Sequence, residues 1–309
     1  MASAILGQTV IMLALMTVGV VCAKMRLISE ASNKDLSKFM LQVVNPVVIF
    51  ISYQREYRHE LVKNLLITFA LSVGAFAIFI SGAYLLVRNK KGRETEIDRF
   101  SAIYSNCGFI GIPLVNALFG AEGVFYLTAF ITVFNIVVWT HGVIMISGER
   151  KLGQAVKVFY SPTMIAIYLG LITFFARISL PELLLSSLGY IKELNTPMAM
   201  IVSGVTISAT KITGLLKKHR IYYVCLLKLL ILPALLAVPL ALMDGIDEKV
   251  RMTVLVAAAA PPAAMCTLMS IKYGRDSVYS SEIFAAGTVL SVCTLPLIVK
   301  ATEFLTKNL

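Results

Sequence analysis

The stretch SNCGFIGIP occupies residues 105–113, inside a long uncharged run, and the stretch AAPPAAM occupies residues 259–265, inside another. Proline lacks a backbone N–H and interrupts a helix, so Pro113 and Pro262 each predict a break. In lipid an unsatisfied backbone group costs several kcal/mol, so a broken helix is tolerated only where it lines a protected cavity. The two stretches therefore predict a cavity deep inside a membrane protein.

A second pair of prolines, Pro46 and Pro197, lies in two further apolar runs. Pro46 and Pro197 are 151 residues apart, and Pro113 and Pro262 are 149 residues apart, so prolines recur at nearly equivalent positions in the two halves of the chain. Paired interrupted helices in two repeats are typical of the binding site of a membrane transporter. A single proline or small-residue cluster would more often mark a kink or close helix packing.

The composition supports an integral membrane protein. The hydrophobic fraction is 58% and the mean hydropathy is +0.83, whereas soluble domains are roughly 45–50% apolar. A span needs about 20 mainly apolar residues, and the uncharged runs predict ten transmembrane helices. These runs cover residues 1–23, 39–54, 64–87, 100–121, 123–148, 158–176, 194–210, 221–243 (interrupted by Lys228), 252–271 and 283–299.

The fold class predicted is an all-α integral membrane protein of two inverted five-helix repeats, residues 1–148 and 149–309. With both termini outside, the inner loops hold 18 Lys and Arg residues and the outer segments nine, which satisfies the positive-inside rule. The first run ends at Lys24 without a cleavage site and indicates a retained helix. The net charge of +11 reflects this inner bias, so no nucleic-acid partner is expected.

Because five is odd, the two repeats enter the membrane from opposite sides, and the fourth and ninth helices should cross near the midplane. Pro113 and Pro262 are predicted to start half-helices whose free N–H groups and positive dipole ends face the cavity. Gly108 and Gly111 suit an unwound segment, and the Asn106 amide can donate to a carboxylate. The crossing thus predicts an anion site.

The run from Asn106 to Pro113, followed by Phe119-Gly120, resembles the N-x-G-F-x-G-x-P signature of the auxin efflux carrier family. The resemblance extends over the chain, through Asn45-Pro46, Thr196-Pro197 and the double proline. It implies the fold of bile-acid sodium symporters and sodium/proton antiporters, with scaffold helices 1, 2, 6 and 7 and a transport domain of helices 3–5 and 8–10. The short junction between the halves is similar to that of bacterial carboxylate and malonate permeases rather than plant PIN carriers.

Polar residues inside the helices have alternative explanations. Lys228 lies roughly 13 Å into the bilayer from His219, where it would hold an anionic substrate or a carboxylate such as Glu282, or else snorkel to the inner surface. Asn135 and His141 lie on different faces of the fifth helix, where lone polar residues more often join helices than bind substrate. Asn135 remains a site candidate.

The acidic residues Asp98, Glu122, Asp244, Asp247, Glu248 and Glu282 all lie near helix ends, which argues against an antiporter with central acids. The five cysteines show no metal-like spacing, so neither disulfides nor a metal site is expected. No cofactor is predicted, and the coupling ion, sodium or proton, is left open. A membrane enzyme would need a catalytic motif, and the sequence contains no Gly-x-Ser-x-Gly elbow or metal-binding His pair.

These observations predict a secondary transporter of the inner (plasma) membrane. It would move small organic anions, such as malonate, malate or auxin-like acids, by elevator-type alternating access. The alternative is a membrane-embedded receptor or sensor with the same fold. Besides the organic anion and lipid, the expected partner is a second copy, bound through the scaffold helices. The predicted substrate-binding residues are Asn45, Asn106, Cys107, Gly108, Gly111, Pro113, Asn135, Lys228, Pro261, Pro262, Ala263 and Met265.

Overall fold

A computed structural model describes residues 2–308 except 90–93, 149–158 and 211–217. Over these residues the chain is helical, and the one β-type contact is an isolated bridge. The α-helices are α1 (Ala2–Lys24), α2 (Glu30–Phe39), α3 (Asn45–Ser52), α4 (His59–Leu86), α5 (Thr95–Ile103), α6 (Ile112–Val137), α7 (Val143–Ser147), α9 (Pro162–Phe175), α10 (Glu182–Glu193), α11 (Asn195–Ser208), α13 (His219–Leu226), α14 (Leu232–Leu242), α15 (Glu248–Ala259), α16 (Met265–Lys272) and α17 (Ser277–Asn308). Four π-helical turns join some of them: η1 (Met40–Val44), η2 (Cys107–Gly111), η3 (Val138–Gly142) and η4 (Leu227–Ile231).

Within the described ranges, six helical segments are long and apolar enough to cross a membrane. They are Ser3–Lys24, Glu30–Ser52, His59–Leu86, Cys107–Ser147, His219–Leu242 and Ser277–Lys307, and Pro162–Phe175 is a shorter apolar helix. The predicted all-helical, multi-pass class is therefore confirmed. The number of crossings, ten, stays a prediction.

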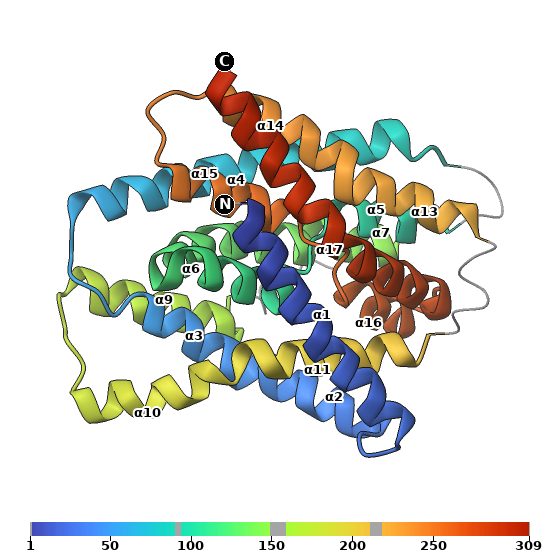
Figure 1. Ribbon diagram of the computed structural model, residues 1–309, viewed down its shortest axis with the longest axis horizontal. Helices are drawn as coiled ribbons and strands as arrows, with labels where there is room; N and C mark the ends of the chain where they lie inside the picture. Colours follow the sequence, from blue (N-terminus) through green and yellow to red (C-terminus); the bar gives the residue numbers. More distant parts are fainter. Residues whose placement is uncertain (1, 90–93, 149–158, 211–217, 309) are drawn as a thin grey trace.

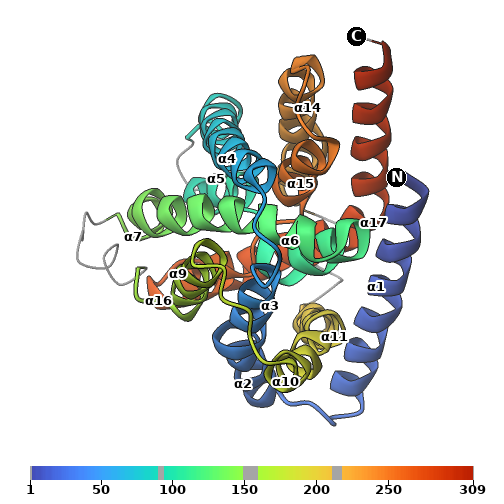
Figure 2. The same ribbon diagram turned by 90° about the vertical axis from the view of Figure 1, so that its left-hand side faces the viewer.

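Helix α1 packs along α11, and α17 lies beside α1 (Figures 1 and 2). The contact between α1 and α11 is close because a glycine from each helix faces the backbone of the other. A Cβ at Gly19 would stand 2.2 Å from the Ile201 carbonyl oxygen, and one at Gly204 would stand 2.0 Å from the Met16 carbonyl oxygen. Only glycine allows this approach of the two backbones.

Three π-turns end two residues before a proline: η1 before Pro46, η2 before Pro113 and η4 before Pro233. Proline cannot donate to the carbonyl four residues earlier, and its ring crowds that carbonyl. The preceding turn therefore widens and closes with bonds to the fifth residue back, as from the Ile112 N–H to the Cys107 carbonyl.

This widening corrects three predictions. The helix stays continuous through Pro46, over Glu30–Ser52, so Pro46 marks a bulge and not a break. The half-helix after the first break starts at Cys107, six residues before Pro113, so Pro113 does not start it, and Gly108 and Gly111 lie in a π-turn and not in an unwound segment. Pro197 lies in the first turn of α11, where a missing N–H costs little.

The predicted runs 100–121 and 123–148 are joined by a single helix, α6, which has a kink at Gly120. Gly120 adopts φ 61° and ψ −153°, a backbone conformation in which a side chain would be strained. Helix α6 packs against α4 and α15, and aromatic side chains of α4, α6 and the end of α5 lie in the core. The Phe76 and Phe130 rings lie 5.3 Å apart, and Phe100 and Tyr104 lie 4.4 Å apart. This core surrounds the chain segments that follow α5 and α15.

Candidate functional site

Two extended segments cross in the interior, one between α5 and η2 and one between α15 and α16. Ser105 and Pro262 form an antiparallel bridge. The Asn106 N–H donates to the Pro261 carbonyl at 2.7 Å, and the Ala263 N–H donates to the Tyr104 carbonyl at 3.0 Å. We call residues 104–106 and 260–264 the crossing.

The crossing uses its two prolines differently from the prediction. Pro262 lies in the bridge itself, and the half-helix begins at Met265, so Pro262 does not start it. Position 262 can be a proline, which has no N–H, because the two hydrogen bonds of the bridge are formed by the Pro261 carbonyl and the Ala263 N–H. Two helices thus end at the crossing, α5 and α15, and two begin beside it, at Cys107 and Met265.

Lys228, in η4, lies directly against the crossing and is 0% exposed. Its Nζ donates to the Ser105 hydroxyl at 2.7 Å, to the Ala258 carbonyl at 3.1 Å and to the Ile103 carbonyl at 3.2 Å. The Phe79 ring centroid is 4.8 Å from the same nitrogen. These positions exclude the snorkelling alternative, because the ammonium is inside the protein.

Glu282, the carboxylate suggested as a partner of Lys228, pairs with Lys218 instead. A second buried carboxylate, Asp98, accepts from Arg220 Nε at 2.8 Å and from the Tyr279 hydroxyl at 2.7 Å. Two of the acidic residues near helix ends, Asp98 and Glu282, are thus buried, with 1–2% of their surface exposed. Each is buried together with a cationic side chain that pairs with it.

Asn106 is 6% exposed, and its Nδ2 has no hydrogen-bond partner among the described residues. It lies directly before the start of η2, whereas the predicted half-helix began at Pro113. A buried donor without an acceptor costs about 1–3 kcal/mol. An anion bound at the crossing would supply the missing acceptor and lie near the free N–H groups of the new helix.

A pair of asparagines lies beside η2. Asn195 Nδ2 donates to Asn45 Oδ1 at 2.8 Å, and both side chains are buried. Asn45 Nδ2 would be 3.5 Å from a Cβ at Gly108, so this amide lies next to the π-turn. Asn195 is absent from the predicted site, although it lies 150 residues after Asn45 and the repeat spacing could have revealed it.

A cavity of about 420 Å³ lies between α2, η1 and α11 on one side and η2, α16 and α17 on the other. We call it the lower cavity. Its walls are mainly apolar, with Phe109, Leu268 and Phe284 among them. Two buried polar atoms in its lining, Asn33 Oδ1 and Ser203 Oγ, have no partner among the described residues. No sequence signal pointed to these two residues, because packing of distant helices brings them together.

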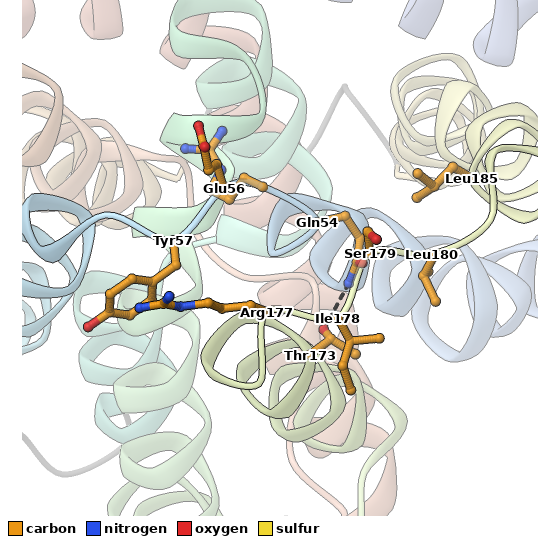
Figure 3. Close-up of a pocket in the computed structure, with 10 residues that line it drawn as sticks. Gln54, Glu56, Tyr57, Thr173, Arg177, Ile178, Ser179, Leu180 and Leu185 are labelled. Atoms are coloured by element: carbon orange, nitrogen blue, oxygen red, sulfur yellow. Dashed lines mark hydrogen bonds between the residues drawn. The ribbon is translucent and has the colours of Figure 1, made fainter.

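A second cavity, of about 540 Å³, lies at the opposite end of the Glu30–Ser52 segment (Figure 3). We call it the upper cavity. Arg177 lies over the Tyr57 ring at 4.9 Å, and Gln54 Nε2 donates to Thr173 Oγ1 at 2.9 Å. Its lining comes from the segments around residues 54–57 and 173–185 and includes no residue of the crossing.

Next to the upper cavity, side chains from the chain just after α3 meet α6. The Tyr53 hydroxyl and Thr128 Oγ1 are 2.6 Å apart and buried. Arg55 lies 3.8 Å from Glu122, which also pairs with Lys249 at 3.1 Å. The lower cavity reaches Ala264 of the crossing and Phe109 beside it, whereas the lining of the upper cavity includes no residue of the crossing.

The remaining residues predicted to bind substrate lie partly at the crossing and partly away from it. Cys107, Pro261 and Ala263 are buried at the crossing, and Met265 starts the adjoining helix. Asn135 lies half-buried on α6 without a side-chain hydrogen bond to a described residue. His141 bonds to the hydroxyls of Tyr104, at 2.8 Å, and Tyr84, at 3.2 Å, which fits the interfacial role expected for it.

A helical membrane protein with two interrupted helices that cross beside a cavity has the architecture of a transporter. The chain belongs to the auxin efflux carrier family: the family model described as membrane transport protein matches residues 4–299. It is also 25% identical to an uncharacterized transporter from Methanothermobacter thermautotrophicus over 296 residues, which cover 92% of this chain and 94% of the relative. The protein is therefore a multi-pass membrane transporter.

Proposed function

We propose that the protein is a secondary transporter that binds small organic anions at the crossing and moves them by elevator-type alternating access. The observation that carries the proposal is the unpartnered, buried Nδ2 of Asn106 beside the start of a helix. A carboxylate is the acceptor that such a donor and the free N–H groups of a helix N-terminus favour. Carboxylates such as malonate, malate or auxin-like acids are the proposed cargo.

The proposed architecture has ten spans in two inverted repeats, residues 1–148 and 149–309. Spans 1, 2, 6 and 7, which include α1, α2–α3, α9 and α10–α11, form a fixed scaffold. Spans 3–5 and 8–10 form the moving domain and carry the crossing. The lower cavity supports this division because it lies between elements of the two groups.

With both termini outside the inner membrane, Lys34 and Lys38 at the mouth of the lower cavity face the cytoplasm. The contacts of Tyr53 with Thr128 and of Arg55 with Glu122 then close the outer side. We therefore assign the conformation as inward-open. Release of these outer contacts would accompany the movement of the crossing toward the outside.

Uptake into proteoliposomes tests the proposal. Liposomes containing the purified protein should accumulate radiolabelled malonate, malate or phenylacetate faster than liposomes without it, with gradients of sodium and protons imposed in turn. Saturable uptake of at least one of these anions is the expected result. Binding of an anion without any uptake would favour the receptor class instead.

The proposed topology makes a separate prediction. Single cysteines at Asn89 and Asp244, in a background without the natural cysteines, should react with a membrane-impermeant thiol reagent from opposite sides of the membrane. Asn89 should react from the cytoplasmic side, because 18 Lys and Arg residues lie in the inner loops against nine outside. Reaction of both cysteines from the same side would contradict the ten-span topology.

A further inference from the structure

Arg251, in the first turn of α15, is a buried cation without an ion pair to any described residue. It is 7% exposed, and a guanidinium keeps its charge inside a protein. Its Nη1 donates to Thr306 Oγ1 at 3.1 Å, and its Nη2 donates to the Met243 and Ile246 carbonyls at 3.2 and 3.4 Å. Its buried Nε has no hydrogen-bond partner among the described residues. Because an unpaired buried charge is costly, this position favours a bound anion.

Arg251 lines a cavity of about 430 Å³ between the start of α15 and the end of α17. We call it the rim cavity. Its lining is mostly charged and consists of Glu248, Arg251, Met252, Glu303, Thr306 and Lys307. Glu248 and Lys307 are exposed, so a ligand can reach the cavity from outside the protein. Two cations and two carboxylates around one space suit a zwitterion, which brings an anionic group to the cations and an ammonium group to the carboxylates.

Two of the membrane-span candidates end at the rim cavity. The span His219–Leu242 ends next to Met243, whose carbonyl accepts from Arg251, and the span Ser277–Lys307 ends in the cavity lining. Helices α14, α15 and α17 pack against one another (Figure 2). The large apolar side chains of Leu242, Met243 and Phe304, near the same helix ends, are 42–66% exposed. A charged cavity at the ends of spans, with exposed apolar side chains close by, lies at the level of the lipid headgroups.

We propose that the rim cavity binds the headgroup of a zwitterionic phospholipid with a primary ammonium group, phosphatidylethanolamine. The phosphate lies beside the Arg251 guanidinium and supplies its counter-charge, and the ammonium lies beside Glu248 and Glu303. A phosphocholine headgroup has no N–H to donate to a carboxylate, and a phosphoglycerol headgroup has no cation, so both should bind more weakly. The site is separate from the crossing and does not depend on which cargo the protein transports.

The lipid preference of the purified wild-type protein tests the inference. The protein in detergent is titrated with phosphatidylethanolamine, phosphatidylcholine and phosphatidylglycerol that carry identical acyl chains, and native mass spectrometry counts the bound lipids. Phosphatidylethanolamine should bind at least about threefold more tightly than either of the others. At saturation it should also raise the thermal unfolding midpoint by about 2 °C or more, because it binds the folded state.

Arg251→Gln removes the buried charge and should weaken binding of phosphatidylethanolamine by about tenfold or more. Since Arg251 also holds the Met243 and Ile246 carbonyls, a second variant at an exposed position, Glu248→Gln, is needed in case the first does not fold. Glu248→Gln should lower the preference for phosphatidylethanolamine over phosphatidylcholine by about twofold or more. Lys300→Gln, a substitution of an exposed lysine on α17 outside the cavity lining, is the matched control and should keep the wild-type preference.

Equal binding of the three lipids by the wild type would overturn the inference, whether or not the variants fold. A wild-type preference retained in folded Glu248→Gln or Arg251→Gln protein would also overturn it. Soluble glycerophosphoethanolamine, which lacks acyl chains, is the last probe. If it raises the unfolding midpoint as much as the lipid does at the same concentration, the cavity takes a free phosphodiester and the assignment to a lipid is wrong.

Discussion

Asn106→Ala should weaken binding of the transported anion by about 10- to 150-fold, the equivalent of a lost hydrogen bond to a charged group of about 1.5–3 kcal/mol. Expression and thermal stability should stay near the wild-type values, because the Asn106 Nδ2 contributes no hydrogen bond to a described residue. A residue with a purely structural role would show the reverse, an unchanged affinity and a lower stability. Competition of uptake and the thermal unfolding midpoint together measure both quantities.

Asn116→Ala is the matched control for this prediction. Asn116 lies on α6, ten residues after Asn106, and is only partly buried. Its removal should leave the affinity within about twofold of the wild type, since a substitution away from the site has small effects. Equal affinities of wild type, Asn106→Ala and Asn116→Ala would contradict the assignment of the binding site to the crossing.

Gly204→Ala should destabilise the protein by about 3 kcal/mol or more. The added methyl group would stand 2.0 Å from the Met16 carbonyl oxygen, which belongs to the backbone of α1 and cannot rotate away. The two helices would have to separate along their whole contact. The thermal unfolding midpoint in detergent should therefore fall, and the yield of folded protein with it.

Gly7→Ala provides the control, because a Cβ at Gly7 meets nothing within 4 Å. Both substitutions replace a glycine inside a helix by alanine. The higher helix propensity of alanine should stabilise the folded state by about the same amount in each, roughly 0.5–1 kcal/mol. Their difference therefore isolates the close contact of α1 with α11. A Gly204→Ala midpoint equal to that of Gly7→Ala would contradict this packing.

The sequence predicted the two breaks that meet at the crossing, but not the continuous helix through Pro46, and it predicted less well how the broken helices resume. Asn106 and the double proline at Pro261 and Pro262 were correctly placed at a crossing. Pro113 was expected to start a half-helix, but a π-turn accommodates it and the helix starts earlier, at Cys107. This outcome depends on hydrogen-bond spacing along one turn, which residue types alone do not define.

Side-chain partners were harder to predict than breaks. Lys228 was left between a role in the site, a carboxylate partner and snorkelling to the inner surface. Neither Glu282 nor the inner surface receives it, because the carbonyl ends of α5 and α15 come together only in the folded chain. Ser203 carried no signal, since its place in the lower cavity depends on packing between helices far apart in sequence. Apolar runs and the positions of proline and glycine predict where helices begin and end. Contacts between helices that are far apart in sequence are seen only in the tertiary structure.

A structure determined by electron microscopy with a bound organic anion would locate the substrate site. The protein should be prepared with the anion that gives the highest uptake, at a concentration well above the half-saturation value. Density for the carboxylate is expected within hydrogen-bond distance of Asn106 Nδ2, beside the crossing. Density for the anion in the upper cavity beside Arg177 instead, with the crossing unoccupied, would contradict it.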